Sequence, residues 1–317
     1  MDFNLTDKQR ALEKLAHDFA EKEIRPVILD RDKIKDPLER FPWDILEKGS
    51  QLGLRTLSIP EERGGGGANI LDLCIIGEEI AWGDLGIAVT FEQTWKIIHF
   101  LDKVWNEEQR SRYLPAFLED HRFHLAVGMT EPNAGSENFY SRDDPELGVK
   151  TSATRKGDNW LINGSKHYIS NGGIAKLYTL VTRTDPKVGV AEGVTYFMVS
   201  PDMEGFSIGE IHDKMGQRLS QNAELIFKDC KVPDCNRVTE IGGGVKARSG
   251  SFNRGSVIES AATALGPARA AYEDAVEHAH NRIQGGKPII EHQGVGFMLA
   301  DCFIDYQAAR QTLHYAA

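Results

Sequence analysis

The feature that most constrains the fold is a change in hydrophobic pattern along the chain, from helical to strand-like and back to helical. Thr6 and Gln9 form a capping box, the usual start of a helix. Apolar residues then recur at helical spacing, at Leu12, Leu15 and Phe19, until Pro26 ends the pattern. The same spacing predicts further helices over residues 43–54, 70–82, 87–104 and 107–118.

Strand signals replace this pattern from residue 125 to residue 232. Asn163-Gly164 lies between apolar runs at 160–162 and 168–169, and this dipeptide is the strongest short-range sign of a β-hairpin turn. Further β-rich runs are bounded by Gly, Pro, Asp and Asn, at residues 177–182, 194–199 and 224–227. The sequence therefore predicts a central all-β unit.

Helical spacing returns after the glycine run 242–244 and predicts helices over 256–281 and from 289 onward. The last helix carries an apolar stripe suited to a bundle, at Val295, Leu299, Cys302, Phe303, Tyr306, Ala309 and Leu313. It reaches Ala317 without a Gly, Asn or Pro stop, which predicts that it continues further. An apolar face would then remain for the N-terminal helices, a partner subunit or residues missing from this chain.

These changes of pattern predict an α+β multidomain protein. We expect an N-terminal α-helical domain at 1–124, a central β-barrel-like domain at 125–238 and an incomplete C-terminal helical bundle at 239–317. The glycines at 64–67 connect two helical stretches, and no Gly-Lys-Ser/Thr follows them as a phosphate-binding loop requires. We interpret that run as a flexible connector.

Composition excludes several classes of function. A net charge of −10 argues against binding nucleic acid, and no apolar run is long enough to span a membrane. The first ten residues resemble neither a secretory signal nor a transit peptide, so we expect a cytoplasmic protein, or a mitochondrial-matrix one if it is the mature form of a eukaryotic precursor. The four cysteines are too scattered for a disulfide framework and are interpreted as reduced packing residues, and no histidine cluster predicts a metal site.

Segments at the joints of the α, β, α order carry a more specific pattern. They are residues 129–136 (MTEPNAGS), 161–172 (LINGSKHYISNG), 215–218 (MGQR) with 224–233 (ELIFKDCKVP), and 282–288 (RIQGGKP) with 291–293 (EHQ). In these motifs, and in their order, the chain resembles the acyl-CoA dehydrogenase family of flavoproteins over nearly its whole length. The resemblance implies FAD-dependent removal of a hydride and a proton from adjacent carbons of an acyl-CoA thioester, a step of fatty acid metabolism, to give a 2-enoyl-CoA.

The resemblance also implies flavin contacts in the β domain. Thr130 and the backbone around Met129 would lie against the flavin ring, and the Ser170 hydroxyl would hydrogen-bond it in place of the usual threonine. Ser136 would lie at the flavin phosphate or the thioester, and Tyr168 where most relatives carry Trp. The alternative is that Thr130 and Ser136 cap turns and Tyr168 packs in the sheet.

Two positions resemble residues that reach the neighbouring subunit's flavin diphosphate and adenosine, namely Arg282 and Gln293. A guanidinium fork suits a diphosphate, so we expect a homodimer or homotetramer, with a homologous subunit as a further possibility. The alternative role for Arg282 is a cation at a helix C-terminus. Glu92 aligns near the floor of the acyl pocket, where a carboxylate favours a short or polar acyl group. Its alternative is a solvated helix residue, the interpretation we favour. Asn253 is a further expected substrate-binding position.

The resemblance fails at the catalytic base. Relatives carry a glutamate either on a late helix, which would lie beyond Ala317, or near what is here Gly255-Ser256, where no carboxylate stands. Glu259, one turn along, is the fallback. A glycine-rich flavin segment is also missing, so the chain looks like a C-terminally truncated family member.

The leading hypothesis is an acyl-CoA dehydrogenase that passes electrons to an electron-transfer flavoprotein. One alternative is a flavin oxidase or monooxygenase on the same scaffold, which would use oxygen directly. The other is a non-catalytic subunit that supplies half of a flavin site to a base-bearing partner.

Overall fold

The computed structural model describes residues 4–139, 143–251 and 255–317. Contacts divide the chain into two compact units. The first comprises Met1–Lys33, Ala68–Val89 and Gly255–Ala317, and the second Ile34–Gly67 and Thr90–Arg254. Each unit is therefore assembled from segments that lie far apart in the sequence.

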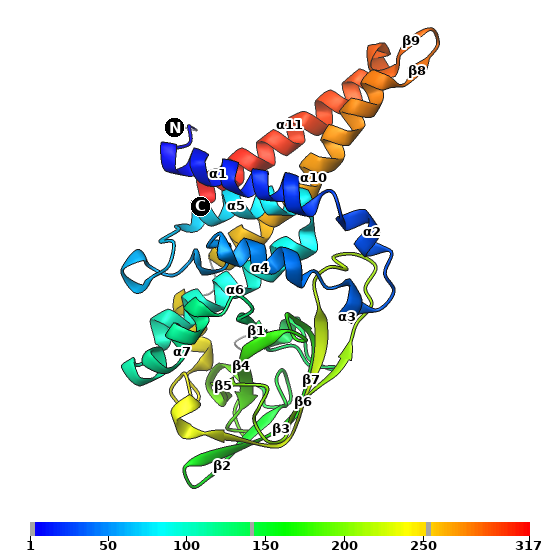
Figure 1. The fold of residues 1–317 in the computed structure, drawn as a ribbon. Helices are drawn as coiled ribbons and strands as arrows, with labels where there is room; N and C mark the ends of the chain where they lie inside the picture. Colours follow the sequence, from blue (N-terminus) through cyan, green and yellow to red (C-terminus); the bar gives the residue numbers. More distant parts are fainter. Residues whose placement is uncertain (1–3, 140–142, 252–254) are drawn as a thin grey trace. The chain divides into compact units, whose positions relative to one another are not determined.

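The first unit is helical (Figure 1). Its helices are α1 (Asp7–Phe19), which continues as a π-helical turn (Ala20–Ile24), α2 (Ile28–Asp32), α5 (Ile70–Gly83), α10 (Gly255–Asn281) and α11 (Gln293–Ala316). A two-stranded ribbon joins the last two helices through β8 (Ile283–Gln284) and β9 (Lys287–Pro288). The capping box predicted at the start of α1 is confirmed, because Gln9 N donates to Thr6 Oγ1 at 3.2 Å and Thr6 N donates to Gln9 Oε1 at 2.9 Å.

Most residues of helix α5 are buried. Gly266 lets α10 approach it closely, since a Cβ at that position would lie 2.5 Å from the carbonyl carbon of Ala81. Two buried carboxylates on α5, Glu78 and Glu79, accept hydrogen bonds from Arg310 on α11 and Arg269 on α10 respectively. A buried ionic network therefore joins these three helices.

The apolar stripe predicted on the last helix is only partly covered in this chain. Leu313 is buried and Tyr306 is half-buried, but Phe303 exposes 46% of its surface. Other large apolar side chains of α10 and α11 are also exposed, among them Val257, Phe297, Met298 and Ile304.

The second unit combines helices with one sheet. Its helices are α3 (Pro37–Arg40), α4 (Trp43–Gln51), α6 (Leu85–Val104, which begins in the first unit), α7 (Glu107–Glu119), α8 (Val190–Gly193) and α9 (Gly244–Ser251). The glycines at 64–67 form a hydrogen-bonded turn rather than the flexible connector we predicted. Gly67 N donates to Ile59 O at 2.9 Å, and a Cβ at Gly65 would lie 2.2 Å from the same oxygen.

A seven-stranded curled sheet forms the rest of the second unit (Figure 1). Its strands are β1 (His124–Gly128), β2 (Ser152–Lys156), β3 (Asn159–Ser170), β4 (Ala175–Arg183), β5 (Val194–Val199), β6 (Phe206–Ile211) and β7 (Asn222–Pro233). The order is β1-β4-β2-β3-β7-β6, and β5 pairs with β4. Strand β1 runs parallel to β4, and the long strands β3 and β7 pair antiparallel.

The hairpin predicted at Asn163-Gly164 is wrong. Both residues lie inside β3, at a bulge in its pairing with β7. The Asn163 amide group exchanges two hydrogen bonds with Asp229 on β7, and a Cβ at Gly164 would lie 2.7 Å from Thr151 Oγ1. The turn lies earlier, at residues 157–158, because Lys156 pairs with Asn159 across it.

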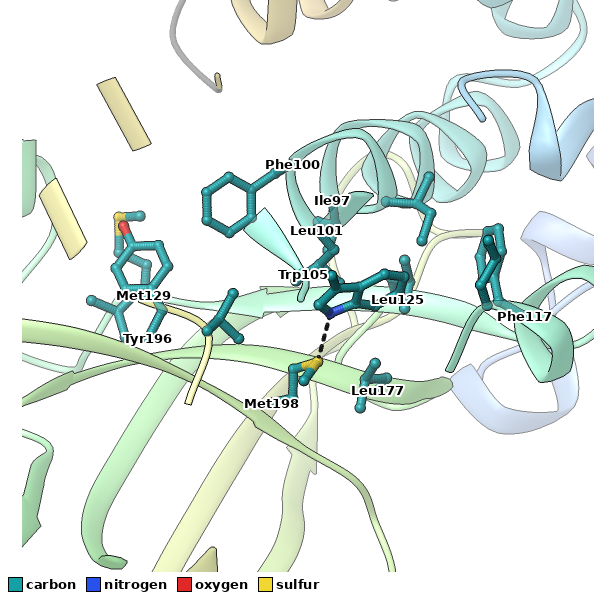
Figure 2. Packing of buried hydrophobic residues seen from close by; sticks show 14 of the residues in the cluster. Ile97, Phe100, Leu101, Trp105, Phe117, Leu125, Met129, Leu177, Tyr196 and Met198 are labelled. Carbon is teal, nitrogen blue, oxygen red and sulfur yellow. Dashed lines mark hydrogen bonds between the residues drawn. The ribbon is translucent and has the colours of Figure 1, made fainter. Parts of the chain in front are cut away.

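A large apolar core packs between the sheet and helices of this unit (Figure 2). Trp105 Nε1 donates to Met198 Sδ at 2.9 Å in its centre. Figure 2 shows Met129 beside Tyr196 at one side of this cluster, so the loop that follows β1 starts from a fixed, buried side chain.

The predicted α, β, α architecture is confirmed, with a curled open sheet as the central β part. The domain boundaries at 124/125 and 238/239 remain a prediction. All four cysteines are free, but only Cys74 and Cys230 are buried, so the packing role predicted for Cys235 and Cys302 is wrong. Within the described ranges, no helix is both long and apolar enough to cross a membrane.

Candidate functional site

The loop after β1 carries the first group of predicted site residues. Met129 is buried, Thr130 is half-buried and Ser136 is exposed at the start of a 3₁₀ turn, Ser136–Phe139. Between them the chain makes a tight turn, in which Glu131 and Ala134 exchange two backbone hydrogen bonds of 2.9 and 3.2 Å. The loop is therefore a fixed structure that ends in an exposed hydroxyl.

The second half of β3 carries Tyr168 and Ser170. The pairing of β3 with β7 shifts register between Lys166 and Ile169, and Tyr168 adopts a left-handed backbone conformation with φ of 57°. Such a bulge turns a side chain out of the regular alternation. Tyr168 is consequently 62% exposed, and the alternative that it packs in the sheet is wrong.

Asn222, the first residue of β7, holds this bulge. Its Nδ2 donates to Tyr168 O at 3.1 Å and to Ser170 Oγ at 3.3 Å. One amide group therefore fixes the backbone of the exposed aromatic residue and the hydroxyl of the predicted flavin contact two positions later.

Two imidazoles lie against the Tyr168 ring. The His167 and His212 ring centroids lie 4.1 and 4.9 Å from that of Tyr168, and 4.7 Å from one another. His167 Nδ1 and His212 Nε2 are both buried atoms without a hydrogen-bond partner among the described residues. Buried polar atoms of this kind are normally satisfied, so a polar ligand at this wall would remove a cost.

The loop and the strand are joined at two adjacent residues. His167 N donates to Thr130 O at 2.8 Å, and Lys166 Nζ donates to Met129 O at 3.2 Å and to Glu131 Oε1 at 2.8 Å. Burial lowers the pKa of Lys166 to about 8, although Glu131 opposes this effect. Burial also resists ionisation of Glu131, but the charge and hydrogen bond of Lys166 outweigh it and lower the carboxyl pKa below its ordinary value.

The structure thus brings Met129, Thr130, Tyr168 and Ser170 to one wall of the second unit. The aromatic ring is exposed, while the backbone beneath it is tied down by buried side chains. This is an arrangement that can hold a flat, polar ring system against a preorganised surface.

The structure contradicts our interpretation of Glu92. We favoured a solvated helix residue, but Glu92 is 2% exposed on α6 and forms an ion pair with Lys96, one turn further along. A charge of this kind is retained in a core when it is paired. The location of Glu92 at an acyl pocket remains a prediction.

The other predicted residues belong to the first unit. Arg282 follows the last residue of α10, Gln293 begins α11, and both are exposed beside the β8–β9 ribbon. Glu259 is 7% exposed on α10. Asn253 lies outside the described residues.

Sequence reasoning missed the roles of four residues at this wall. Glu131 and Lys166 stood within the motifs, and Lys166 follows Ile162 at the two-residue period of a strand face, which predicts an inward side chain. His212 and Asn222 carried no local signal, because only long-range pairing brings them to β3.

Comparison with known proteins identifies the family. The models of the acyl-CoA dehydrogenase N-terminal, middle and C-terminal domains match residues 6–121, 126–230 and 242–317. A short-chain specific acyl-CoA dehydrogenase of Megasphaera elsdenii is 37% identical over 324 residues, which cover 100% of this chain and 80% of that protein.

Solved structures give the same result. Butyryl-CoA dehydrogenase from Megasphaera elsdenii superposes with a TM-score of 0.90 at 36% identity, covering 100% of this chain and 80% of that one. A chain in the structure of the electron transferring flavoprotein of Acidaminococcus fermentans gives a TM-score of 0.89 at 34% identity, covering 99% of this chain and 79% of that one. This chain therefore belongs to the acyl-CoA dehydrogenase family.

Proposed function

We propose that this protein is an FAD-dependent acyl-CoA dehydrogenase that converts an acyl-CoA thioester into a 2-enoyl-CoA. The observation that carries the proposal is the match of three family domains, in order, from residue 6 to residue 317. When bound, FAD supplies the acceptor for the hydride that leaves the acyl chain.

The wall formed by the loop and β3 fits this cofactor. Tyr168 offers an exposed aromatic face, and the buried nitrogen atom His167 Nδ1 still lacks a hydrogen-bond partner in the described chain. We propose that Thr130 and the Met129 backbone hold the ring, that the Ser170 hydroxyl hydrogen-bonds it, and that Ser136 holds the phosphate or the thioester.

The acyl group is proposed to be short. The buried Glu92–Lys96 pair places charge in the interior of the unit, and a long alkyl tail would not solvate it. The name of the Megasphaera elsdenii relative, short-chain specific, points the same way. We expect the rate with butyryl-CoA to exceed that with long-chain acyl-CoAs, and Glu92→Gln to reduce this preference. Asn253 is kept as a proposed contact to the substrate.

Glu259 is proposed as a candidate for the group that takes the α-proton. It is a buried carboxylate on α10, and general-base catalysis by a positioned carboxylate contributes about 10²–10⁴-fold. Glu259→Gln would then lower the rate of flavin reduction by about that factor. An unchanged rate would remove Glu259 from this role.

Two partners are proposed. Electrons would pass to an electron-transfer flavoprotein, in line with the relative found in the Acidaminococcus structure. Arg282 and Gln293 would complete a second subunit's FAD site in a homodimer or homotetramer, because both are exposed at the β8–β9 end of the helical pair. Sedimentation analysis of the wild type and Arg282→Ala, with FAD binding measured on each, tests this.

All four cysteines are free, which fits the cytoplasm as the proposed compartment.

The decisive experiment is to load the chain with FAD, exclude oxygen and add butyryl-CoA. We expect the visible flavin absorbance to bleach and the electrons to appear in added electron-transfer flavoprotein. Absence of bleaching with acyl-CoAs of every length would contradict the proposal. Rapid reoxidation of the bleached flavin by air would instead favour the oxidase alternative.

A further inference from the structure

We propose that the buried pair of Lys166 and Glu131 is a positioning device that aligns the two flavin-contacting segments and thereby sets the affinity for FAD. This inference rests on the function proposed above. It concerns two residues that do not contact the cofactor themselves in this account but act through Met129 and Thr130.

The first step of the argument is the connectivity of Lys166. Its Nζ donates to the Met129 carbonyl at 3.2 Å and to Glu131 Oε1 at 2.8 Å, so one ammonium group spans the beginning of the loop. Lys166 is fully buried, and the Glu131 side chain is 8% exposed. Neither charge can exchange its partner for water without a rearrangement of the loop.

Glu131 is held independently of Lys166. Its Oε2 accepts from Lys150 N at 2.7 Å and its Oε1 from Thr151 N at 2.8 Å. The carboxylate is therefore anchored to the chain just before β2, and Lys166 transmits that fixed position to the Met129 carbonyl. A charged carboxylate bound by backbone N–H groups is a strong and directional contact.

The second step concerns what such a pair contributes. A buried ion pair is often no more stabilising than apolar residues of similar volume, because both charges lose their hydration. A contribution to stability therefore does not by itself explain why Lys166 and Glu131 are paired in the core. Its geometric effect is specific, since it fixes a carbonyl whose residue adjoins Thr130.

The third step is the order of attachments along β3. Lys166 binds the Met129 carbonyl, His167 N donates to the Thr130 carbonyl at 2.8 Å, and the next residue is the exposed Tyr168. Loss of Lys166 would remove the bond to the Met129 carbonyl and leave only the bond from His167 N to the Thr130 carbonyl, about which the loop could rotate. The loop would then turn relative to the aromatic face with which it is proposed to hold the flavin.

The test compares Lys166→Met, the double variant Glu131→Gln/Lys166→Met and the control Lys176→Met. Lys176 lies on β4 and forms an exposed ion pair with Asp120, so the control removes the same type of pair from the surface. The double variant leaves no unpaired buried charge, so we expect it to fold even if Lys166→Met alone does not. Apoprotein of each is titrated with FAD by fluorescence quenching, and its thermal midpoint is recorded.

We expect the FAD dissociation constant to rise about 10-fold or more in both Lys166 variants, as for other groups that act through a direct ligand contact. It should stay within about 2-fold in Lys176→Met. The double variant should recover part of the thermal stability, because glutamine keeps one of the two oxygens that accept from Lys150 N and Thr151 N. It should not recover FAD affinity, because the bond to Met129 remains absent. Recovery of wild-type affinity by the double variant overturns the proposal. Failure of the wild-type chain to bind FAD would overturn the proposed function, and this inference with it.

Discussion

Replacing Arg269 with methionine tests how the first unit is held together. The Arg269 guanidinium donates to both carboxylate oxygens of Glu79, at 2.5 and 2.6 Å, and it lies 3.5 Å from Glu78 Oε1. The Glu79 and Glu78 side chains are 3% and 1% exposed. Burial lowers the pKa of Arg269, but the two carboxylates outweigh it and raise that pKa above its ordinary value.

The expected loss of unfolding free energy follows from the burial of these carboxylates. Methionine occupies a similar volume, but it leaves the Glu79 carboxylate facing His17 Nδ1, 2.8 Å away, without the guanidinium. Removing one partner of a buried ion pair costs about 3–5 kcal/mol. For a chain of this length, the unfolding entropy is about 0.7 kcal/mol/K, so we expect Tm to fall by about 4–8 °C.

The assay is urea unfolding followed by circular dichroism, together with a thermal scan. Arg10→Met is the matched control, because Arg10 pairs with Asp7 and their side chains are 57% and 99% exposed. It should cost less than about 1 kcal/mol. Glu79→Gln/Arg269→Met should recover part of the loss. If Arg269→Met costs no more than Arg10→Met, the buried network does not hold these helices together.

Three further predictions concern the second unit. Burial lowers the pKa of His124 to about 3, below its unfolded value of about 6.5. The contribution of His124 to stability is therefore fully present above about pH 6.5 and is smaller by about 2 kcal/mol at about pH 5. Urea unfolding should show a correspondingly smaller loss between these pH values in His124→Leu than in the wild type; an equal loss would contradict this. Gly164→Ala would place a Cβ 2.8 Å from Thr151 Cα at a φ of 140°. It should lower the unfolding free energy by about 1–3 kcal/mol more than Gly157→Ala, whose Cβ meets nothing within 4 Å. Equal urea midpoints of the two variants would refute the clash. Tyr168→Ala should lower the unfolding free energy by only about 0.5–1.5 kcal/mol, through the lost ring contacts with His167 and His212. It should also weaken FAD binding measured by fluorescence; unchanged affinity would remove Tyr168 from the site.

Local signals in the sequence located most elements of the fold. The capping box of Thr6 and Gln9 depends on residues one turn apart, and the structure contains it as predicted. The prediction of a turn at Asn163-Gly164 was wrong because the turn signal is local, whereas the interaction that overrides it joins residues far apart in the sequence. Asp229, on β7, pairs with Asn163 and draws the dipeptide into a strand.

As with the fold, local sequence signals predicted part of the candidate site, and long-range contacts determine the rest. The motifs identified the two segments that form its wall, since they appear as strings in the sequence. The Lys166–Glu131 pair joins residues 35 positions apart, and no local pattern reports such a contact. Glu92 was misjudged because a Glu and a Lys four residues apart usually share a solvent-exposed helix face, whereas the core encloses this pair.

Hydrogen–deuterium exchange of the chain with and without FAD tests the central claim most directly, because it locates the cofactor without relying on turnover. We predict that FAD slows exchange of the backbone amides of residues 129–136 and 166–171. FAD binding that leaves both segments unprotected would contradict the site described above.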